Sequence, residues 1–161
     1  MRKKEARSER REARKTAPRD KKVKNALEIY NHVLREWAGA TSPDMVDEVP
    51  RERLLDAMLR LFESLDDAGL RSPLAAQDIN WQSAKPYLVA LHDAIRWQLL
   101  VLELSVPKLA APVAPTVLTL AALRWMKIWL ADDTSGQSKL MAAIDRDLGR
   151  LDVAVQQFMR F

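Results

Sequence analysis

Two histidines are the only imidazole groups in the chain, and nothing near them completes a catalytic or metal site. His32 falls on the polar edge of a predicted helix, and His92 stands beside Asp93. Neither belongs to an H-x-x-x-H or H-E-x-x-H pattern, so the ligands of a zinc site are missing. We therefore expect His92 to have a structural role, hydrogen-bonded within or at the edge of a helical bundle.

Other residue patterns that support catalysis are also missing. The chain contains no cysteine, which excludes disulfides, thiolate ligands and cysteine nucleophiles. Four scattered glycines cannot build a phosphate-binding loop, and no G-x-S-x-G, G-x-x-x-x-G-K or G-x-G-x-x-G occurs. Asp66–Asp67 and Asp132–Asp133 are adjacent carboxylates at predicted helix ends, where solvation is a simpler explanation than acid–base catalysis. The sequence predicts a protein that is not an enzyme and holds no cofactor or metal.

The elements that must position any site are helices. Apolar residues make up 48% of the chain, and they recur at helical spacing without strand-like alternation. Pro50 is expected to open the second helix, Ser72–Pro73 the third, and the T-x-x-Q spacing of Thr134 and Gln137 the last. The pattern predicts an all-α bundle of about six helices, over about residues 21–39, 50–69, 72–79, 86–104, 116–130 and 134–160.

Charge divides the chain into a basic N-terminal segment and a mildly acidic remainder. Residues 1–25 hold 12 Lys/Arg and 4 Asp/Glu, a net charge of +8, whereas residues 26–161 have a net charge of −4. Residues 1–20 have no apolar face, so we predict a disordered tail followed by one helical domain over residues 21–161. The tail is either a solvated extension or a non-specific contact with nucleic acid or anionic lipid, through Arg2, Lys3, Lys4, Arg7, Arg10, Arg11, Arg14 and Lys15.

No apolar run is long enough to span a bilayer. Residues 94–104 come closest, but Arg96 and Glu103 interrupt them. The basic N-terminus lacks the apolar region of a secretory signal. We expect a cytoplasmic protein.

The last predicted helix carries a heptad seam, in which apolar residues alternate at spacings of three and four. Such a seam is narrower than the buried stripe of a helix embedded in a monomer. We expect the last two helices to pair with those of a second copy or with another helical protein, although closure of an intramolecular bundle is the alternative. The predicted interface consists of Trp129, Met141, Ile144, Leu148, Leu151, Val155 and Phe158.

Five tryptophans are either ordinary core residues or the lining of a pocket for a small hydrophobic ligand. A pocket would lie between the second, fourth and fifth predicted helices, with His92 or Arg124 orienting the ligand. Its predicted lining is Met58, Phe62, Leu88, Leu91, His92, Ile95, Arg124 and Trp125.

Three segments resemble TetR-type regulators. Residues 123–135 are Leu-Arg-Trp-Met-Lys-Ile-Trp-Leu-Ala-Asp-Asp-Thr-Ser, residues 140–148 are Leu-Met-Ala-Ala-Ile-Asp-Arg-Asp-Leu, and the run from Pro50 to Asp56 leads to Phe62. They are similar to the C-terminal ligand-binding and dimerisation domains of an alphaproteobacterial branch, whose fold a lipid-binding accessory protein of ubiquinone biosynthesis shares. The resemblance covers roughly residues 26–152 and implies a dimerising domain with an apolar pocket.

The resemblance lacks one part of those regulators, their N-terminal helix-turn-helix. Only about 25 residues precede the first predicted helix, and they offer no core that could hold a DNA-reading helix. We therefore expect a non-enzymatic regulatory or adaptor domain without its own DNA reader. The alternatives are a lipid- or quinone-binding accessory protein at a membrane surface, and a subunit of a larger assembly whose basic tail contacts nucleic acid.

Overall fold

The computed structural model of the protein describes residues 25–40, 48–76, 81–104, 106–108, 110–134 and 136–158. These residues form helices and no strand, which confirms the predicted all-α bundle. The predicted tail, residues 1–20, lies outside the described residues. A first helix covers residues 25–39, and it is followed by α2 (Pro50–Asp67), α3 (Arg71–Ala75), α4 (Trp81–Val101), α5 (Ala114–Ala131) and α6 (Ser138–Phe158).

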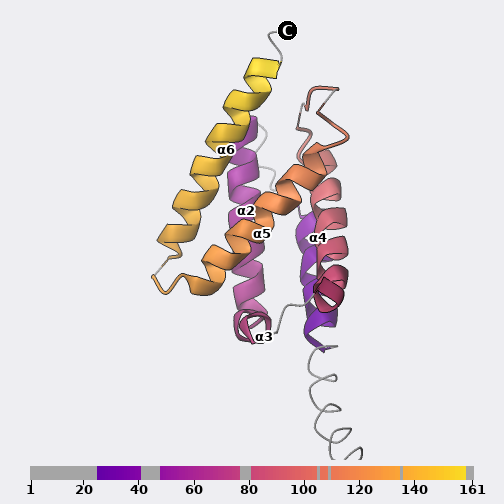
Figure 1. Ribbon diagram of the computed structural model, residues 1–161, viewed down its shortest axis with the longest axis vertical. Helices are drawn as coiled ribbons and strands as arrows, with labels where there is room; N and C mark the ends of the chain where they lie inside the picture. Colours follow the sequence, from indigo (N-terminus) through magenta and orange to yellow (C-terminus); the bar gives the residue numbers. More distant parts are fainter. Residues whose placement is uncertain are drawn as a thin grey trace, which may run out of the picture.

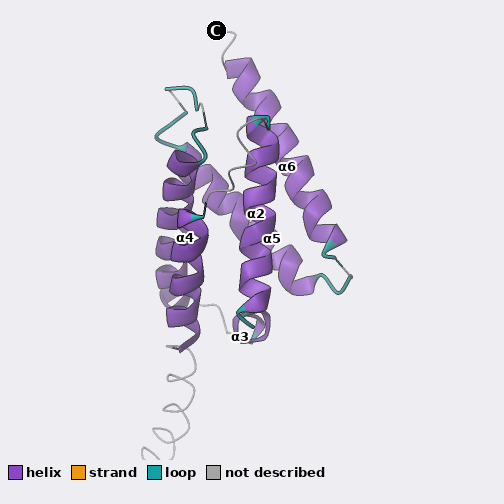
Figure 2. Ribbon diagram, turned by 180° about the vertical axis from the view of Figure 1, so that it is seen from behind, coloured by secondary structure: helices purple, strands orange, loops and turns teal. Residues whose placement is uncertain are grey.

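The helices form a bundle in which α5 is the crossing element (Figure 1). The helix over residues 25–39 lies beside α4, while α2 and α6 lie together on the other side (Figures 1 and 2). α5 begins at the end of α4 and runs diagonally to the start of α6, and it contacts both of these helices. Its mostly apolar sequence fits this position, because a helix with neighbours on several sides needs more than one apolar face.

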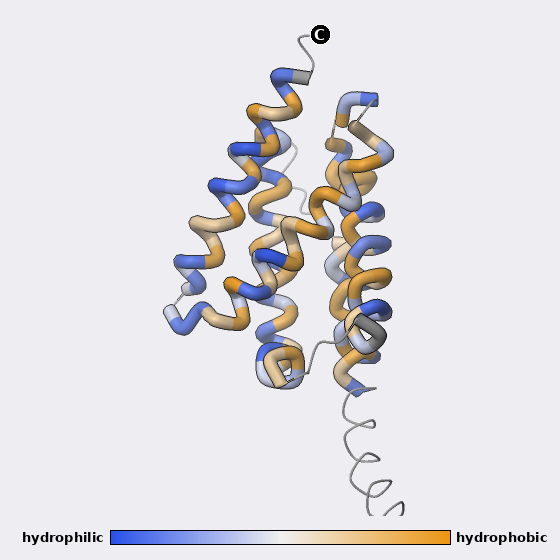
Figure 3. Tube along the Cα trace, in the orientation of Figure 1, coloured by the Kyte–Doolittle hydropathy of each residue, from blue (hydrophilic) through white to orange (hydrophobic). Residues whose placement is uncertain are grey.

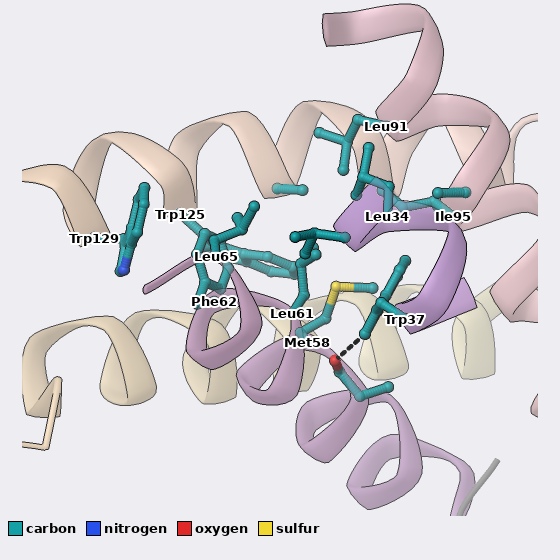
Figure 4. Close-up of a cluster of buried hydrophobic side chains, with 14 of the residues drawn as sticks. Leu34, Trp37, Met58, Leu61, Phe62, Leu65, Leu91, Ile95, Trp125 and Trp129 are labelled. Carbon is teal, nitrogen blue, oxygen red and sulfur yellow. Dashed lines mark hydrogen bonds between the residues drawn. The ribbon is translucent and has the colours of Figure 1, made fainter. Parts of the chain in front are cut away.

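The core consists of large side chains from every long helix. Trp37 belongs to it, and its indole Nε1 donates a hydrogen bond of 2.6 Å to the carbonyl of Ala57 (Figure 4). This bond satisfies the one polar atom of the buried ring. The labelled core residues are Leu34, Trp37, Met58, Leu61, Phe62, Leu65, Leu91, Ile95, Trp125 and Trp129 (Figure 4).

Several predicted helix limits are confirmed and others are wrong. α2 begins at Pro50 as expected, and Gly69 follows its end with a φ of 67°, a conformation that glycine adopts without strain. α4 begins at Trp81, so that Pro86 lies inside it. Pro86 is the sixth residue of α4, where it has no N–H to donate to the carbonyl four residues before it. The buried Leu70, and not Ser72, holds the position before α3.

None of the helices in the described part of the chain combines the length and the apolar composition that a bilayer crossing requires.

Candidate functional site

The outer side of α4 forms one wall of an open groove of about 530 Å³, here called the α4 groove. This volume lies within the range of small-molecule sites, roughly 300–1,000 Å³. The other wall is the connection between α4 and α5 and the first turn of α5. The lining residues are His92, Arg96, Leu99 and Leu100 from α4, and Leu104, Val106, Ala111, Pro112, Ala114 and Pro115 from the opposite wall.

Two of the lining side chains of the α4 groove are basic and none is acidic. His92 and Arg96 are one helical turn apart, so they lie on the same side of α4. Within the described residues, Arg96 has no carboxylate partner. The His92 side chain is 38% exposed, and its Nδ1 lies 3.7 Å from the Asp93 carboxylate. The groove therefore combines apolar walls with an uncompensated positive charge.

The conformation of the groove wall is fixed by contacts behind α4. The Arg53 guanidinium donates a hydrogen bond of 2.8 Å to the Leu102 carbonyl, at the end of α4. Gln98 is buried, and with its amide nitrogen turned toward the first helix it donates to the carbonyls of Trp37 and Ala38, at 3.1 and 3.0 Å. Both side chains donate to carbonyls at or near helix ends, where intrahelical donors run out.

A second hollow, of about 510 Å³, lies on the other side of α4, against the helix over residues 25–39. Its lining includes Trp97 and three alanines, Ala38, Ala90 and Ala94. Arg35 and Asp93 place charges of both signs around it. This hollow therefore has no net preference for a ligand of either charge, in contrast to the α4 groove.

The predicted pocket residues lie mainly in the closed core. Met58, Phe62, Leu91, Ile95 and Trp125 are all fully or almost fully buried and belong to one packed cluster (Figure 4). Leu88 is half-buried on α4. Of the eight predicted residues, only His92 lines the α4 groove. Arg124 pairs with Asp147 at 3.0 Å, so its charge is already compensated.

The predicted interface residues divide between the core and the surface. Trp129, Ile144 and Leu148 are buried within the single chain, where α6 packs on α2 and α5. Leu151 and Val155 are half-buried, and Met141 is 47% exposed. The Phe158 side chain lies outside the described part of the structure. The alternative of intramolecular closure accounts for Trp129, Ile144 and Leu148. Self-association stays a prediction.

Asp66 contradicts the expectation of a solvated carboxylate at a helix end. Arg71 binds both of its oxygens, at 2.7 and 2.8 Å. The Trp129 indole and the Gln137 amide also donate to it, at 3.0 and 2.6 Å. These donors, foremost Arg71, hold the pKa of Asp66 below its usual value. The expectation failed because the partners come from three separate segments of the chain.

Asp132 likewise differs from the expected solvated residue, since it is buried and caps the start of α6. Its carboxylate accepts hydrogen bonds from the Thr134 hydroxyl and from the backbone N–H groups of Thr134 and Leu140, at 2.5, 3.0 and 3.0 Å. These bonds lower the pKa of Asp132 to about 2. The predicted capping box is therefore incomplete, because Gln137 turns to Asp66 and Asp132 takes its place.

Asp147 is buried like Asp132, and it joins α6 to α5. It accepts hydrogen bonds from Arg124 and from the indole Nε1 of Trp125, the latter at 3.0 Å. All three carboxylates are thus fully engaged in holding helices together. Across the described ranges, no group of three or more His, Asp or Glu side chains is arranged to hold a metal ion.

Arg96 is the residue of the α4 groove that sequence reasoning missed, because it was seen only as an interruption of an apolar run. Its spacing of four from His92, just before a proline-rich connection, was the available signal. The chain matches no protein-family model, no curated protein and no solved structure.

Proposed function

We propose that the protein is a cytoplasmic, non-enzymatic binding domain that takes up a small amphipathic anion in the α4 groove. The apolar part of the ligand lies between α4 and the connection to α5, and its anionic group lies at Arg96 and His92. The observation that carries this proposal is the uncompensated Arg96 guanidinium beside apolar walls of sufficient volume.

The chemistry of the lining favours binding over catalysis. A charge-assisted hydrogen bond from a guanidinium orients a carboxylate or phosphate, while apolar walls contribute most of the binding free energy. The lining of the groove contains no serine, threonine, cysteine, lysine or carboxylate that could act as a nucleophile. The resemblance of residues 123–148 to TetR-type C-terminal domains supports a regulatory or adaptor role for such a ligand-binding domain.

Calorimetric titration with decanoate tests the proposal, with decyltrimethylammonium as the matched cation. We expect decanoate to bind and the cation to bind much more weakly. Arg96→Ala should weaken decanoate binding about ten- to hundredfold, since a charge-assisted hydrogen bond is worth roughly 1.5–3 kcal/mol. Lys85→Ala is the matched control, because Lys85 is an exposed cation of α4 outside the groove. Equal binding of both probes, unchanged by Arg96→Ala, would refute the proposal.

A further inference from the structure

The hollow of about 510 Å³ between the helix over residues 25–39 and α4, here called the helix-pair hollow, is a second candidate binding site. The two helices lie side by side (Figures 1 and 2), and α4 interleaves hydrophobic and hydrophilic positions along its length (Figure 3). Ala38, Ala90 and Ala94 line the hollow, and their single methyl groups fill little of the space between the backbones. Its volume lies within the range of small-molecule sites.

The apolar part of the lining contains an aromatic ring that is only partly covered. Trp97 lines the hollow and is 58% exposed, whereas the neighbouring Leu34 is buried. A flat apolar group in the hollow would cover part of the indole surface, and contact between two aromatic rings is favourable beyond the area that it buries. The lining therefore favours a ligand with an aromatic group.

The two helices also contribute one charge each to the hollow. Arg35 and Asp93 both line it, and no ion pair joins them in the described part of the structure. The Arg35 Nε donates to the carbonyl of Asn31, one turn back in its own helix, at 3.2 Å. The Asp93 carboxylate lies 3.7 Å from the His92 Nδ1, which is too far for a hydrogen bond. Each charge is therefore available to a ligand.

The Asn31 side chain adds an acceptor that has no donor. Asn31 lines the hollow, and its Oδ1 is buried and accepts no hydrogen bond. An amide oxygen that is buried without a donor is unfavourable. A turn of the amide about the Cβ–Cγ bond can bring this oxygen to a donor that enters the hollow. Asn31 therefore favours a ligand that carries N–H groups.

We propose that the helix-pair hollow binds a small zwitterion with an aromatic side group, of the class of the aromatic amino acids. The ligand's carboxylate pairs with Arg35, its ammonium with Asp93 and Asn31, and its ring packs on Trp97. Asp93 would repel a simple anion and Arg35 a simple cation, whereas a zwitterion satisfies both. This goes beyond the proposed function, because the helix-pair hollow and the α4 groove share no lining residue.

Titration of the full chain with L-phenylalanine, followed by two-dimensional ¹H–¹⁵N NMR, tests the proposal. The matched probes are 2-phenylethylamine, which lacks the carboxylate, and 3-phenylpropionate, which lacks the ammonium. We expect L-phenylalanine to give saturable shifts confined to residues 31–38 and 90–97, and each probe to bind about tenfold more weakly there. Shifts are compared at residues 31–38, because 3-phenylpropionate is itself an amphipathic anion and can enter the α4 groove. Equal affinities of the three compounds, or no saturable shifts with L-phenylalanine, would overturn the proposal.

Substitutions of the two charges assign their roles. Arg35→Gln and Asp93→Asn should each weaken L-phenylalanine binding about tenfold, and neither should change thermal unfolding, because both side chains are exposed. In Arg35→Gln, L-phenylalanine should also lose its advantage over 2-phenylethylamine. Lys127→Gln and Asp67→Asn are the matched controls, since these exposed charges lie on α5 and α2, outside the hollow.

Unchanged affinity in Arg35→Gln and Asp93→Asn, or equal losses in the controls, would contradict the assigned site. Decanoate titration of Arg35→Gln, expected to match the unsubstituted protein, separates this proposal from the proposed function.

Discussion

The indole Nε1 of Trp129 donates a hydrogen bond of 3.0 Å to the carboxylate of Asp66, and so joins the end of α5 to the end of α2. Arg71 binds the same carboxylate, and its guanidinium lies over the Trp129 ring, 4.8 Å from the ring centre. The Arg71 guanidinium also donates to the Asp132 carbonyl, at 2.7 Å. Trp129 and Asp132 therefore form a junction with the end of α2 and the start of α3, which gives these residues a structural role.

Asp66→Asn should destabilise the fold, because the charge-assisted bonds from Arg71 lose their ionised acceptor. We expect a loss of about 1–2 kcal/mol in the free energy of unfolding, reduced from the value of a fully buried pair because both side chains are partly exposed. Urea unfolding measures it. Asp67→Asn is the control, since the neighbouring Asp67 is exposed. Equal effects of the two substitutions would contradict the role given to Asp66.

Acid should weaken the same junction. The pKa values of Asp66 and Asp132 are lowered in the folded protein, that of Asp132 to about 2. Their contribution to stability is thus present above the ordinary pKa of about 3.9 and is lost as pH falls from there toward 2, where the unfolded chain binds more protons. At pH 6, Asp132→Asn should unfold at a lower temperature than the unsubstituted protein. This difference in unfolding temperature should shrink toward pH 2, and a difference independent of pH would contradict the assignment.

Leu148→Ala should destabilise each chain by about 2–4 kcal/mol, because it leaves a cavity in the core. Met141→Ala, at an exposed position of the same seam, should cost much less. Denaturation at two protein concentrations, together with native mass, measures both. If the seam paired two chains, the midpoints would depend on concentration, and both substitutions would shift the mass toward monomer.

Blocking the apolar wall of the α4 groove should weaken decanoate binding without affecting the fold. Ala111→Trp introduces a ring into the groove, and displacement of about two methylene groups of the ligand corresponds to roughly tenfold weaker binding. Ala131→Trp, at an exposed position at the end of α5, should leave the affinity unchanged. Calorimetry compares the two variants, and a loss of affinity in both would point to a different site.

Local sequence signals predicted the helices well but not the contacts between them. Pro50 and Gly69 mark the limits of α2 correctly, because both act through the backbone of their own segment. Pro86 misled, because α4 begins five residues before it, so the proline lies inside the helix and does not open it. The heptad seam of α6 was identified correctly as apolar. Spacing alone could not tell whether α2 and α5 of the same chain, or a second copy, would cover Ile144 and Leu148.

The site was harder to predict than the fold, for a related reason. Aromatic residues such as Trp125 occur both in closed cores and in ligand pockets. Only the packing around them in the folded structure distinguishes the two. The partners of Asp66 and Asp147 come from other parts of the chain, so these contacts could not be predicted from the spacing of residues in the sequence. Arg96 lines a groove only because the connection after α4 forms the opposite wall, and this arrangement could not be predicted from the sequence.

Mapping of decanoate binding by two-dimensional ¹H–¹⁵N NMR tests the central claim most directly. The account predicts chemical-shift changes confined to residues 92–104 and 106–115, with the side-chain signal of Arg96 among the most affected. Changes centred on the core around Met58, Phe62 and Trp125, or no saturable changes at all, would contradict a binding site in the α4 groove.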